Sequence, residues 1–298
     1  MFISDHWKSY ELIDAEGGER LERWGSHILV RPDPQVIWHH PRTNPLWNRA
    51  DGVYRRQGGG GSWVVNRMPE SWCVSYPSAA GDLTFRLRPM GFKHTGLFPE
   101  QAANWDWTAG VIREALGSGR KTEAPKVLNL FAYTGGATVA ASKAGASLVH
   151  VDASKGMTNA ARENMQLSGL EDAPCRYIVD DCSKFVAREI RRGNTYDGVI
   201  MDPPSYGRGP RGELWKLEDC ADELVGEVVK LLSPDPLFFL INSYTTGLSP
   251  AVMQYILLSA LPADLRKRAE VEVGETALPV TDSGLFLPSG ASVRVRFR

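Results

Sequence analysis

Apolar and polar positions follow two different periods along the chain. Between Ile3 and about Arg88, apolar residues recur at a spacing close to two, and turn residues separate the runs. This spacing is typical of β-strands that bury one face. The clearest runs are His27–Val30, Trp63–Val65 and Leu83–Leu87. The pattern predicts a small β-rich module in which Gly58–Gly61 forms a hairpin tip or a mobile loop.

After Gln101 the pattern changes, and apolar runs of strand length alternate with segments of helical period. The predicted strands are Lys126–Phe131, Ser147–Asp152, Cys175–Val179, Tyr196–Met201, Pro236–Asn242, Ala269–Gly274 and Ser292–Phe297. The predicted helices are Trp105–Leu116, Ala137–Lys143, Lys155–Leu167, Cys182–Arg192, Asp219–Leu232 and Ala251–Leu258. This alternation predicts a parallel, doubly wound α/β sheet with helices on both faces. Ligands bind beyond the carboxyl ends of such strands, so the residues there are the candidates for a site.

The first strand of this alternation belongs to the stretch VLNLFAYTGGAT at residues 127–138. Its apolar run stops at Tyr133-Thr134-Gly135-Gly136 and gives way to an alanine-rich helix. Glycine allows positive φ and lets the backbone approach a ligand without a Cβ in the way. The amides that open the next helix could then face a bound cofactor.

Acids follow the next three strands. Asp152 ends the second strand, where it can accept hydrogen bonds from a ribose diol. After the third strand, Asp180 can cap the next helix, while Asp181 can accept from an exocyclic adenine amine. The fourth strand leads into Asp202-Pro203-Pro204, where two prolines stiffen the loop, and Tyr206 then offers a face for stacking a flat group.

The same stretch lacks the motifs that bind phosphate groups. The chain has no GxxxxGK[ST], and the turn after the first strand is not GxGxxG. Acceptors for a ribose and an amine, without a phosphate cradle, favour a nucleoside-bearing cofactor over a dinucleotide.

Composition narrows the class of protein further. The chain has 298 residues, 43% of them hydrophobic and 23% charged, with a formal net charge of -1. These values are typical of a globular protein, and they give no general basicity that would indicate nucleic acid. We find no secretory signal and no apolar run of membrane-spanning length, so we expect no membrane association.

Cysteine and histidine usage argues against a metal site. The four cysteines form no CxxC pair, so we expect reduced thiols and a cytoplasmic protein. His39 and His40 are adjacent, and neighbouring residues on a strand point to opposite faces, so they cannot easily bind one ion together. We therefore expect no metal.

The motifs at the strand ends occur in the order found in a known family. VLNLFAYTGGAT, VDAS at 151–154, DD at 180–181 and DPPSYG at 202–207 resemble the successive motifs of class I S-adenosylmethionine-dependent methyltransferases. The finer match is to the bacterial family that includes the large-subunit ribosomal RNA cytosine-C5 methyltransferases and their relatives. KHTGLFPEQAANW at 93–105 and GELWKLED at 212–219 are also similar to that family. The resemblance covers roughly residues 90–298.

This resemblance implies a fold, a cofactor and a set of site residues. The fold is a Rossmann-like, seven-stranded sheet whose last strand is antiparallel, with residues 91–298 as the catalytic domain. Residues 1–90 are the β-rich N-terminal module indicated by their own pattern, and they depart from the family, because they lack the RNA-binding module that the ribosomal enzymes carry there. The cofactor is S-adenosyl-L-methionine. The implied cofactor-binding residues are Phe98, Gln101, Asn129, Phe131, Tyr133, Thr134, Gly135, Gly136, Asp152 for the ribose, Asp181 for the adenine amine, and Asp202. The implied catalytic residues are Asp202, Pro203 and Tyr206.

The chain departs from the cytosine-C5 enzymes at one position that matters. Those enzymes attack the base with a cysteine from the segment after the fifth strand, and here that segment, residues 241–246, reads INSYTT. The Asp202-Pro203-Pro204 loop instead resembles the loop of methyltransferases that alkylate nitrogen atoms, although Ser205 separates Tyr206 from the prolines. We therefore expect direct transfer without a cysteine adduct.

The acceptor is the most open question. Residues 42–67 carry five arginines, with Trp47, Tyr54 and Trp63 between them, which is a composition that suits an RNA surface. The alternative is a half-buried sheet whose outer face is solvated by arginine. We expect RNA, and ribosomal RNA in particular, as the substrate. Two alternatives are methylation of a small molecule or a protein, and a non-catalytic RNA-binding protein with this fold. The sequence leaves the oligomeric state open.

Overall fold

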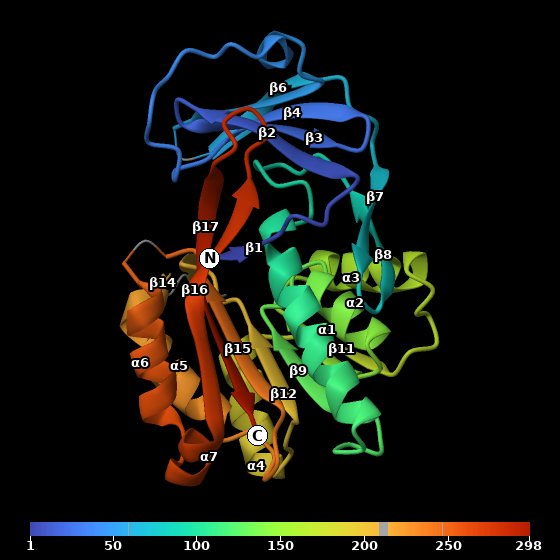
Figure 1. Ribbon diagram of the computed structural model, residues 1–298, viewed down its shortest axis with the longest axis vertical. Helices are drawn as coiled ribbons and strands as arrows, with labels where there is room; N and C mark the ends of the chain where they lie inside the picture. The colour runs from blue at the N-terminus through green and yellow to red at the C-terminus, as the bar shows by residue number, and fades with distance from the viewer. Residues whose placement is uncertain (59, 209–213, 246) are drawn as a thin grey trace. The chain divides into compact units, whose positions relative to one another are not determined.

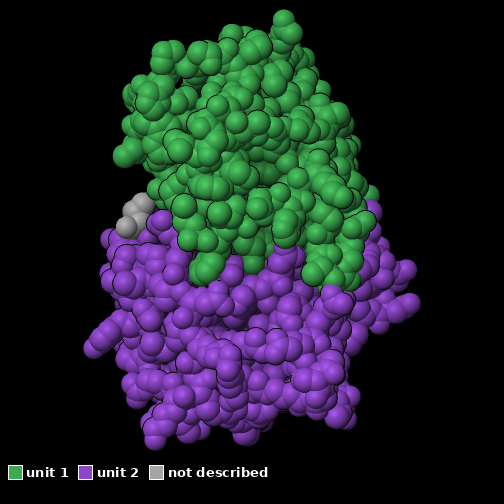
Figure 2. All heavy atoms as spheres, in the orientation of Figure 1, with its two compact units in different colours: residues 1–103, 276–289 green, residues 104–275, 290–298 purple. Residues whose placement is uncertain are grey.

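The computed structural model describes residues 1–58, 60–208, 214–245 and 247–298 (Figure 1). The chain forms two compact units, which Figure 2 colours separately. Unit 1 comprises Met1–Ala103 and Thr276–Ser289, and unit 2 comprises Asn104–Glu275 and Gly290–Arg298. Unit 1 is therefore built from two segments that are far apart in the sequence. The expected division at residue 90 placed the second segment in the catalytic domain.

Unit 1 is rich in β-structure, as the period of two predicted. Its elements are β1 (Phe2–Ile3), β2 (Tyr10–Glu16), β3 (Glu19–Trp24), β4 (His27–Pro32), the 3-10 helix η1 (Pro45–Asn48), β5 (Gly52–Gln57), β6 (Gly60–Asn66), β7 (Trp72–Ser78), β8 (Gly81–Leu87) and η2 (Pro99–Gln101). Strands β2 to β6 form a five-stranded sheet in chain order, and β7 and β8 form a separate antiparallel pair. Gln57 pairs with Gly60 across the β5–β6 hairpin, which confirms the hairpin tip; Gly59 lies outside the described residues.

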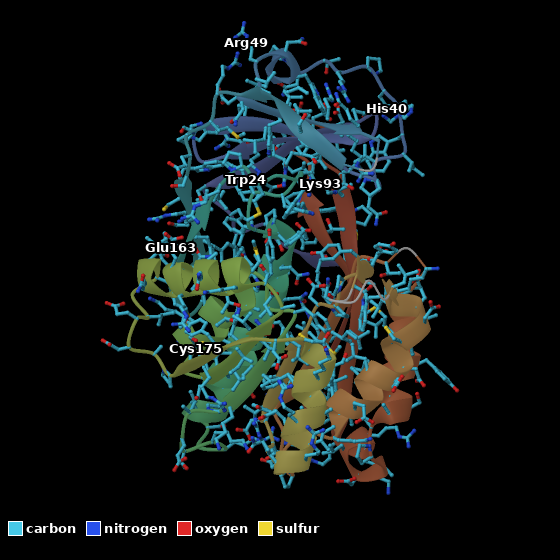
Figure 3. All side chains as sticks on the ribbon, turned by 180° about the vertical axis from the view of Figure 1, so that it is seen from behind. Trp24, His40, Arg49, Lys93, Glu163 and Cys175 are labelled. Carbon is cyan, nitrogen blue, oxygen red and sulfur yellow. The ribbon has the colours of Figure 1, made fainter. Side chains whose placement is uncertain are left out.

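The interior of unit 1 holds a buried charged group. Glu22 is fully buried and accepts two hydrogen bonds from Arg31, at 2.6 and 2.7 Å, and one from the hydroxyl of Tyr10 at 3.0 Å. Burial alone would raise the pKa of Glu22, but the positive charges of Arg31 and Arg20 lower it to about 2. The carboxylate is therefore ionised inside the unit, where removal of a partner would leave an uncompensated charge. Figure 3 labels Trp24, which is also fully buried.

Unit 2 contains the alternating strands and helices. Its strands are β9 (Lys126–Leu130), β10 (Ser147–Asp152), β11 (Cys175–Val179), β12 (Gly198–Met201), β13 (Tyr206–Arg208), β14 (Leu214–Lys216), β15 (Phe238–Ser243), β16 (Ala269–Pro279) and β17 (Phe286–Phe297), the last two of which extend into unit 1. Its helices are α1 (Ala102–Gly117), α2 (Gly136–Lys143), α3 (Lys155–Leu167), α4 (Cys182–Arg192), α5 (Leu217–Val229), α6 (Pro250–Ala260) and α7 (Ala263–Arg268). Helix α1 begins two residues before the boundary of the unit.

Strand β1 and all strands of unit 2 except β13 and β14 form one large sheet in the order β1-β16-β17-β15-β12-β9-β10-β11. Strands β13 and β14 form a separate antiparallel pair. The five strands from β15 to β11 are parallel, and β17 is antiparallel to β15. This confirms the Rossmann-like fold and the antiparallel last strand. All seven predicted strands are present, and β1 of unit 1 adds an eighth beside β16 through Phe2 and Ile3.

Alternate residues of each strand face opposite sides of this sheet. Leu128 and Leu130 of β9 belong to an apolar core that includes residues of helices α4, α5 and α6. Asn129, between them, faces the other side and donates to Thr138 of α2. This alternation follows from the period of two in a strand, and it leaves polar side chains on the α2 side.

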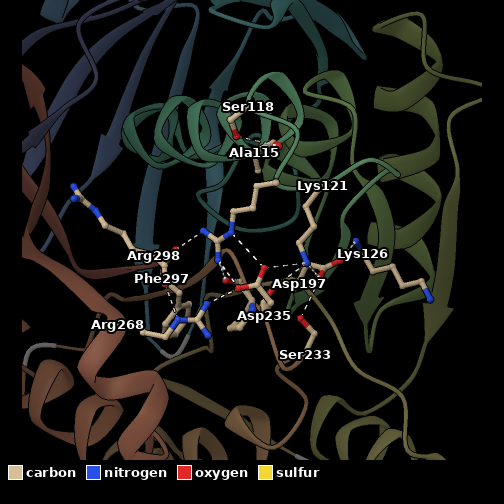
Figure 4. Close-up of polar contacts among 12 residues, drawn as sticks. Ala115, Ser118, Lys121, Lys126, Asp197, Ser233, Asp235, Arg268, Phe297 and Arg298 are labelled. Carbon is tan, nitrogen blue, oxygen red and sulfur yellow. Dashed lines mark hydrogen bonds and ion pairs between the residues drawn. The ribbon is translucent and has the colours of Figure 1, made fainter.

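A polar cluster closes the amino ends of the strands, opposite to the expected site (Figure 4). Asp197, just before β12, accepts from Nζ of Lys121 at 2.8 Å, from the Ser233 hydroxyl at 3.0 Å and from the backbone N–H of Lys126 at 2.9 Å. Arg120 donates to Asp235 and to the carbonyl of Phe297. The loop after α1 is thereby joined to β9, β12, β15 and β17.

Candidate functional site

The carboxyl ends of the parallel strands meet at one edge of the unit 2 sheet. Strands β11, β10, β9, β12 and β15 are neighbours in this order and run in the same direction. The stretch after β9, Asp152 at the end of β10, Asp181 after β11 and Asp202 after β12 therefore lie along one edge. The sequence predicted this grouping.

The loop after β9 has an unusual backbone. Phe131 has a backbone φ of 55° and Tyr133 a φ of 51°, values that residues other than glycine rarely adopt. The backbone N–H of Tyr133 donates to Oδ2 of Asp152 at 2.8 Å, and that of Phe131 donates to Sγ of Cys182 at 3.3 Å. These bonds hold a strained backbone in place, which is a feature of binding and catalytic loops.

Gly135 has the positive φ that the sequence suggested, and both glycines of this loop also lie against helices; their assignment to the cofactor stays a prediction. Gly135 has a φ of 83°, and a Cβ there would lie 2.8 Å from the Cβ of Ala161. A Cβ on Gly136 would lie 2.6 Å from the ring of Trp105. The space beside each glycine is thus occupied by a side chain from another helix of unit 2. The glycines permit close packing of α2 against α1 and α3, and only Gly135 needs positive φ.

Asn129 and Thr134 are buried, and their assignment to the cofactor stays a prediction. Asn129 is 3% exposed, and its amide donates to the Thr138 hydroxyl at 2.9 Å. Thr138 in turn contacts Nδ1 of His150 at 2.9 Å. Thr134 is 2% exposed, and its carbonyl accepts from the amide of Asn164 at 2.9 Å. Through these hydrogen bonds, both residues fix the loop that follows β9.

Asp152 has two structural bonds of its own. Besides Tyr133, it accepts from the backbone N–H of Ser154 at 2.8 Å through Oδ1. Each carboxylate oxygen has two acceptor sites, so one site on each remains for a further donor. Its assignment to the ribose stays a prediction.

The capping residue after β11 is Asp181, not Asp180 as the sequence suggested. Oδ1 of Asp181 accepts from the backbone N–H of Lys184 at 2.9 Å and caps α4. Asp180 pairs instead with Arg188, and it accepts from the backbone N–H of Asp181 at 2.9 Å. The adenine assignment of Asp181 therefore concerns a carboxylate that already has one structural bond, and it stays a prediction.

The Asp-Pro-Pro loop is held from two sides. Oδ1 of Asp202 accepts from Nδ2 of Asn242 at 3.0 Å. The carbonyl of Pro204 accepts from the indole N–H of Trp215 at 2.8 Å. The Trp215 ring centroid also lies 6.0 Å from that of Phe131, so Trp215 links this loop to the loop after β9. Pro203 is buried.

Tyr206 lies beside a pocket, at the start of the β13–β14 hairpin. Its side chain is 57% exposed, as a stacking residue requires. The pocket has a volume of about 490 Å³ and is lined by Ser205, Tyr206, Lys216, Glu218, Asp219, Tyr244 and Thr245. This is large enough for a planar base. Arg211, Gly212, Glu213 and Thr246 lie outside the described residues.

Sequence reasoning missed Trp215 and Asn242 as site residues. Trp215 belongs to the GELWKLED motif, whose role the resemblance left unassigned. Asn242 lies near the end of β15, where the sequence comparison with the cytosine-C5 enzymes concerned only a cysteine. Both form hydrogen bonds to the Asp-Pro-Pro loop across more than ten residues of sequence.

Among the described residues of unit 2, no cysteine offers a nucleophile at this edge. Cys182 is 3% exposed, and burial raises its pKa to about 12, so its thiol stays protonated. Cys220 donates to the carbonyl of Lys216, and burial raises its pKa too. Cys175, labelled in Figure 3, lies at the amino end of β11, away from the strand ends of the site.

Phe98 and Gln101 belong to unit 1, and their assignment to the cofactor stays a prediction. Phe98 precedes the 3-10 helix η2, and its ring centroid lies 5.0 Å from that of His94. Burial, and then the charge of Arg31, lower the pKa of His94 to about 3, so this imidazole is neutral.

The arginine-rich segment of unit 1 favours the half-buried sheet over an open stacking surface. Trp47 is buried and donates to Asp14 at 2.8 Å, and the guanidinium of Arg42 lies over its ring. Tyr54 is 4% exposed and packs edge-on against Trp63. These rings are part of the packing of the unit. The arginines of the segment are exposed, including Arg49, which Figure 3 labels.

Two further searches cover only the described part of the chain. No group of three or more His, Cys, Asp or Glu side chains there is arranged to hold a metal ion. No helix in that part is both long and apolar enough to cross a membrane.

Comparison with known proteins agrees with this geometry. The profile of the family described as S-adenosylmethionine-dependent methyltransferase matches residues 51–237. The "Ribosomal RNA large subunit methyltransferase K/L" of Shewanella frigidimarina is 35% identical over 153 residues, which are 51% of this chain and 20% of that protein. The protein of the same name from Shewanella baltica is 32% identical over 157 residues, again 20% of its length. The chain thus spans about a fifth of the length of these curated relatives.

Solved structures match over a longer range. The crystal structure of the "SAM Dependent Methyltransferase from Agrobacterium tumefaciens" is 33% identical, with a TM-score of 0.87, and the match covers 99% of this chain and 92% of that one. A putative SAM-dependent methyltransferase from Streptococcus mutans has a TM-score of 0.71 at 15% identity, over 98% of this chain and 76% of that one. The second likeness concerns the fold alone.

Proposed function

This chain belongs to the S-adenosylmethionine-dependent methyltransferase family, and we propose that it transfers a methyl group from S-adenosylmethionine to a base of RNA. The observation that carries the proposal is the position of Asp202. Its carboxylate is fixed by Asn242 at the carboxyl end of β12. In the same loop, Tyr206 lines a pocket of about 490 Å³.

The residues at the strand ends fit the cofactor. Asp152 retains acceptor capacity on both carboxylate oxygens, which suits two ribose hydroxyls. Asp181 uses Oδ1 to cap α4, so Oδ2 can accept from an amine. The loop after β9 carries no phosphate-binding motif. Phe131, Tyr133 and the glycine turn border this acid pair, where a nucleoside with a methionine moiety would lie.

The sulfonium of this cofactor supplies an activated methyl group and a good leaving group. Asp202 needs only to accept a hydrogen bond from an N–H group of the RNA base. This bond would align the lone pair of that nitrogen with the methyl group. Alignment and exclusion of water account for most of the rate enhancement in reactions of this kind. Tyr206 would stack on the flat face of the base, and the pocket would hold it.

We propose that the transfer proceeds without a cysteine adduct. A thiol with a pKa near 12, as at Cys182, is almost entirely protonated at neutral pH and is a poor nucleophile. The described residues that follow β15 are Tyr244 and Thr245.

The proposal of RNA, and of ribosomal RNA in particular, rests on the names of the curated relatives that match half of this chain. A cytoplasmic location follows from that substrate. The buried aromatic rings of residues 42–67 mean that the exposed arginines there would contact phosphates rather than bases.

A transfer assay tests the function. The protein would be incubated with S-adenosylmethionine labelled in the methyl group and with separate RNA, protein and small-molecule fractions of a cell extract. We expect the label in the RNA fraction, and none with the Asp202→Asn protein. Label in another fraction would replace RNA with that acceptor class, and the absence of both label and cofactor binding would overturn the proposal.

A further inference from the structure

A continuous row of hydrogen bonds links Asp202 to Arg294, on strand β17. Nδ2 of Asn242 donates to Oδ1 of Asp202 at 3.0 Å. The Ser292 hydroxyl donates to Oδ1 of Asn242 at 2.6 Å, and the amide of Asn104 donates to that hydroxyl at 3.0 Å. The guanidinium of Arg294 donates to Oδ1 of Asn104 at 2.9 Å. We call these five residues the Asp202 row.

The chemistry of its two ends fixes the direction of every bond. Arg294 can only donate, so the amide of Asn104 must present its oxygen to Arg294 and its NH2 to Ser292. Ser292 therefore gives its own proton to the oxygen of Asn242. The NH2 of Asn242 is then left to face Asp202, which as a carboxylate can only accept. Each residue of the row therefore donates to the next one, from the guanidinium of Arg294 to the carboxylate of Asp202.

The row lies inside unit 2 on the α1 side of the sheet. Asn242 and Ser292 are fully buried, Asn104 is 2% exposed and Arg294 is 5% exposed. Asn242 and Ser292 are paired residues on the neighbouring strands β15 and β17. Burial lowers the pKa of Arg294 to about 10, so it remains charged at neutral pH.

Packing alone does not require these polar residues. On the opposite face of the same strands, Ile241, Val293 and Val295 fill an apolar core. Buried polar groups cost free energy unless all are satisfied, and apolar replacements are often as stable. A row of polar residues that ends on a site acid is therefore a candidate for a positioning role.

We infer that Asn242 is a positioning residue, which holds the carboxylate of Asp202 toward the acceptor, and that Arg294 maintains its orientation through Asn104 and Ser292. This inference rests on the proposed role of Asp202. Asn242 acts by fixing one oxygen of Asp202.

The first experiment compares Asn242→Leu with the wild type. Leucine has a similar branched shape, although it is larger, and it cannot donate a hydrogen bond. We expect the pKa of the Asp202 carboxyl, followed by carbon-13 NMR titration, to rise by about one, because a donor to the charged form is lost. We expect kcat for labelled-methyl transfer to fall on the order of 100-fold, with the affinity for S-adenosylmethionine unchanged.

Tyr196→Phe is a matched control for lost stability. It removes a buried hydrogen bond, from the Tyr196 hydroxyl to Glu189 at 2.7 Å, which has no contact with the row. We expect it to lower the melting temperature with little change in kcat. If Asn242→Leu lowers kcat no more than Tyr196→Phe and leaves the pKa of Asp202 unchanged, the inference is wrong.

The far end of the row gives an independent test. Arg294→Lys can still donate to Asn104, whereas Arg294→Met cannot. We expect Arg294→Lys to retain most of the activity. We expect Arg294→Met to lose about tenfold or more, since the side-chain amide of Asn104 can then flip and present its NH2 group in place of its oxygen. Equal activity of the two variants at equal melting temperatures would remove Arg294 from the row.

Asp202→Asn separates this inference from the proposed function. Its Oδ1 can still accept from Asn242, so the row stays intact while the charge is lost. If Asp202→Asn is fully active, the role of Asp202 fails. If it is inactive while Asn242→Leu is fully active, only the positioning role of Asn242 fails. Because the NMR titration needs no acceptor, it tests the row even if RNA is not the substrate.

Discussion

Oδ2 of Asp152 accepts a hydrogen bond from the backbone N–H of Tyr133 at 2.8 Å, so the acid at the end of β10 also holds the loop that follows β9. We expect Asp152→Ala to weaken binding of S-adenosylmethionine by about 1–3 kcal/mol, because hydroxyls of the ribose and the Tyr133 amide lose an acceptor. Isothermal titration calorimetry measures this. Asp172→Ala, in the exposed loop before β11, is the control. Unchanged affinity for Asp152→Ala would disprove the ribose assignment.

Asp202→Asn should separate binding from turnover. The variant can still accept a hydrogen bond from Asn242, but it loses the negative charge that would face the methyl acceptor. We expect kcat to fall by about 100-fold or more, while the affinity for S-adenosylmethionine stays within about twofold of the wild type. Radiolabel transfer and calorimetry on the same preparation give both values. A variant with wild-type kcat would exclude Asp202 from catalysis.

Tyr206 should contribute to acceptor binding through its ring. Because it is 57% exposed, substitutions there should leave the melting temperature unchanged. We expect Tyr206→Ala to raise KM for RNA about tenfold, and Tyr206→Phe to have a small effect, since stacking on a base contributes about 1–3 kcal/mol. Steady-state kinetics on both variants distinguishes stacking from a role of the hydroxyl, which would give equal losses.

Gly136→Ala should destabilise the protein through a steric clash. The added methyl group would lie 2.6 Å from the ring of Trp105, and we expect a loss of about 1–3 kcal/mol of unfolding free energy. Gly226→Ala, in helix α5, is the matched control, because a Cβ there meets nothing within 4 Å. We expect it to stabilise by about 0.5–1 kcal/mol. Denaturant unfolding measures both, and a neutral Gly136→Ala would contradict the packing described above.

His150 should make stability depend on pH. Burial, and then the positive charge of Arg162, lower its pKa from 6.5 to about 4. The unfolded state therefore binds more protons in that interval, and stability is lost as pH falls from 6.5 to about 4. The loss should reach roughly 3 kcal/mol, and His150→Asn, which can still accept from Thr138, should lack it. Urea unfolding of both proteins across this pH interval is the test. If the unfolding free energies of the two proteins change with pH in parallel, the pH dependence does not come from His150.

The sequence predicted the elements of unit 2 well where their ends carry local signals. Helix α3 was predicted with its observed bounds, since Ser154 caps its start. Helix α4 was also predicted correctly, because Asp181 caps its start and Gly193 ends it in a left-handed conformation. The strands β10 and β11 were likewise predicted to the residue, because they are apolar runs between such caps.

Elements that depend on distant contacts were not predicted. The β13–β14 hairpin has strands of three residues and is held to the Asp-Pro-Pro loop by Trp215, so no local pattern marks it. The first half of β17 contains Pro288 and Gly290, which interrupt the strand pattern, so its start was placed at Ser292 instead of Phe286. Helix α7 is a short segment of six residues, and the sequence reading passed over it.

The site was predicted as a set of strand ends but not as a network. The positions of Asp152, Asp181 and Asp202 follow from the alternation of strands and helices. The support from Asn129, Asn164 and Asn242 does not, because each amide bonds to a partner that only the folded chain brings close. For Asn129 and Asn242, a polar residue inside an apolar strand was the signal that could have indicated them; Asn164 lies in α3.

Unit 1 consists of residues 1–103 and 276–289, and this has a consequence for the order of folding during synthesis. Thr281 and Asp282 donate their backbone N–H groups to the carbonyls of Leu12 and Ile13, at 3.0 and 2.9 Å. The ribosome must therefore release all of residues 104–275 before β2 finds these partners. Ser292 and Arg294 follow shortly after. The β-rich unit and the Asp202 row are thus completed within the same few seconds of translation.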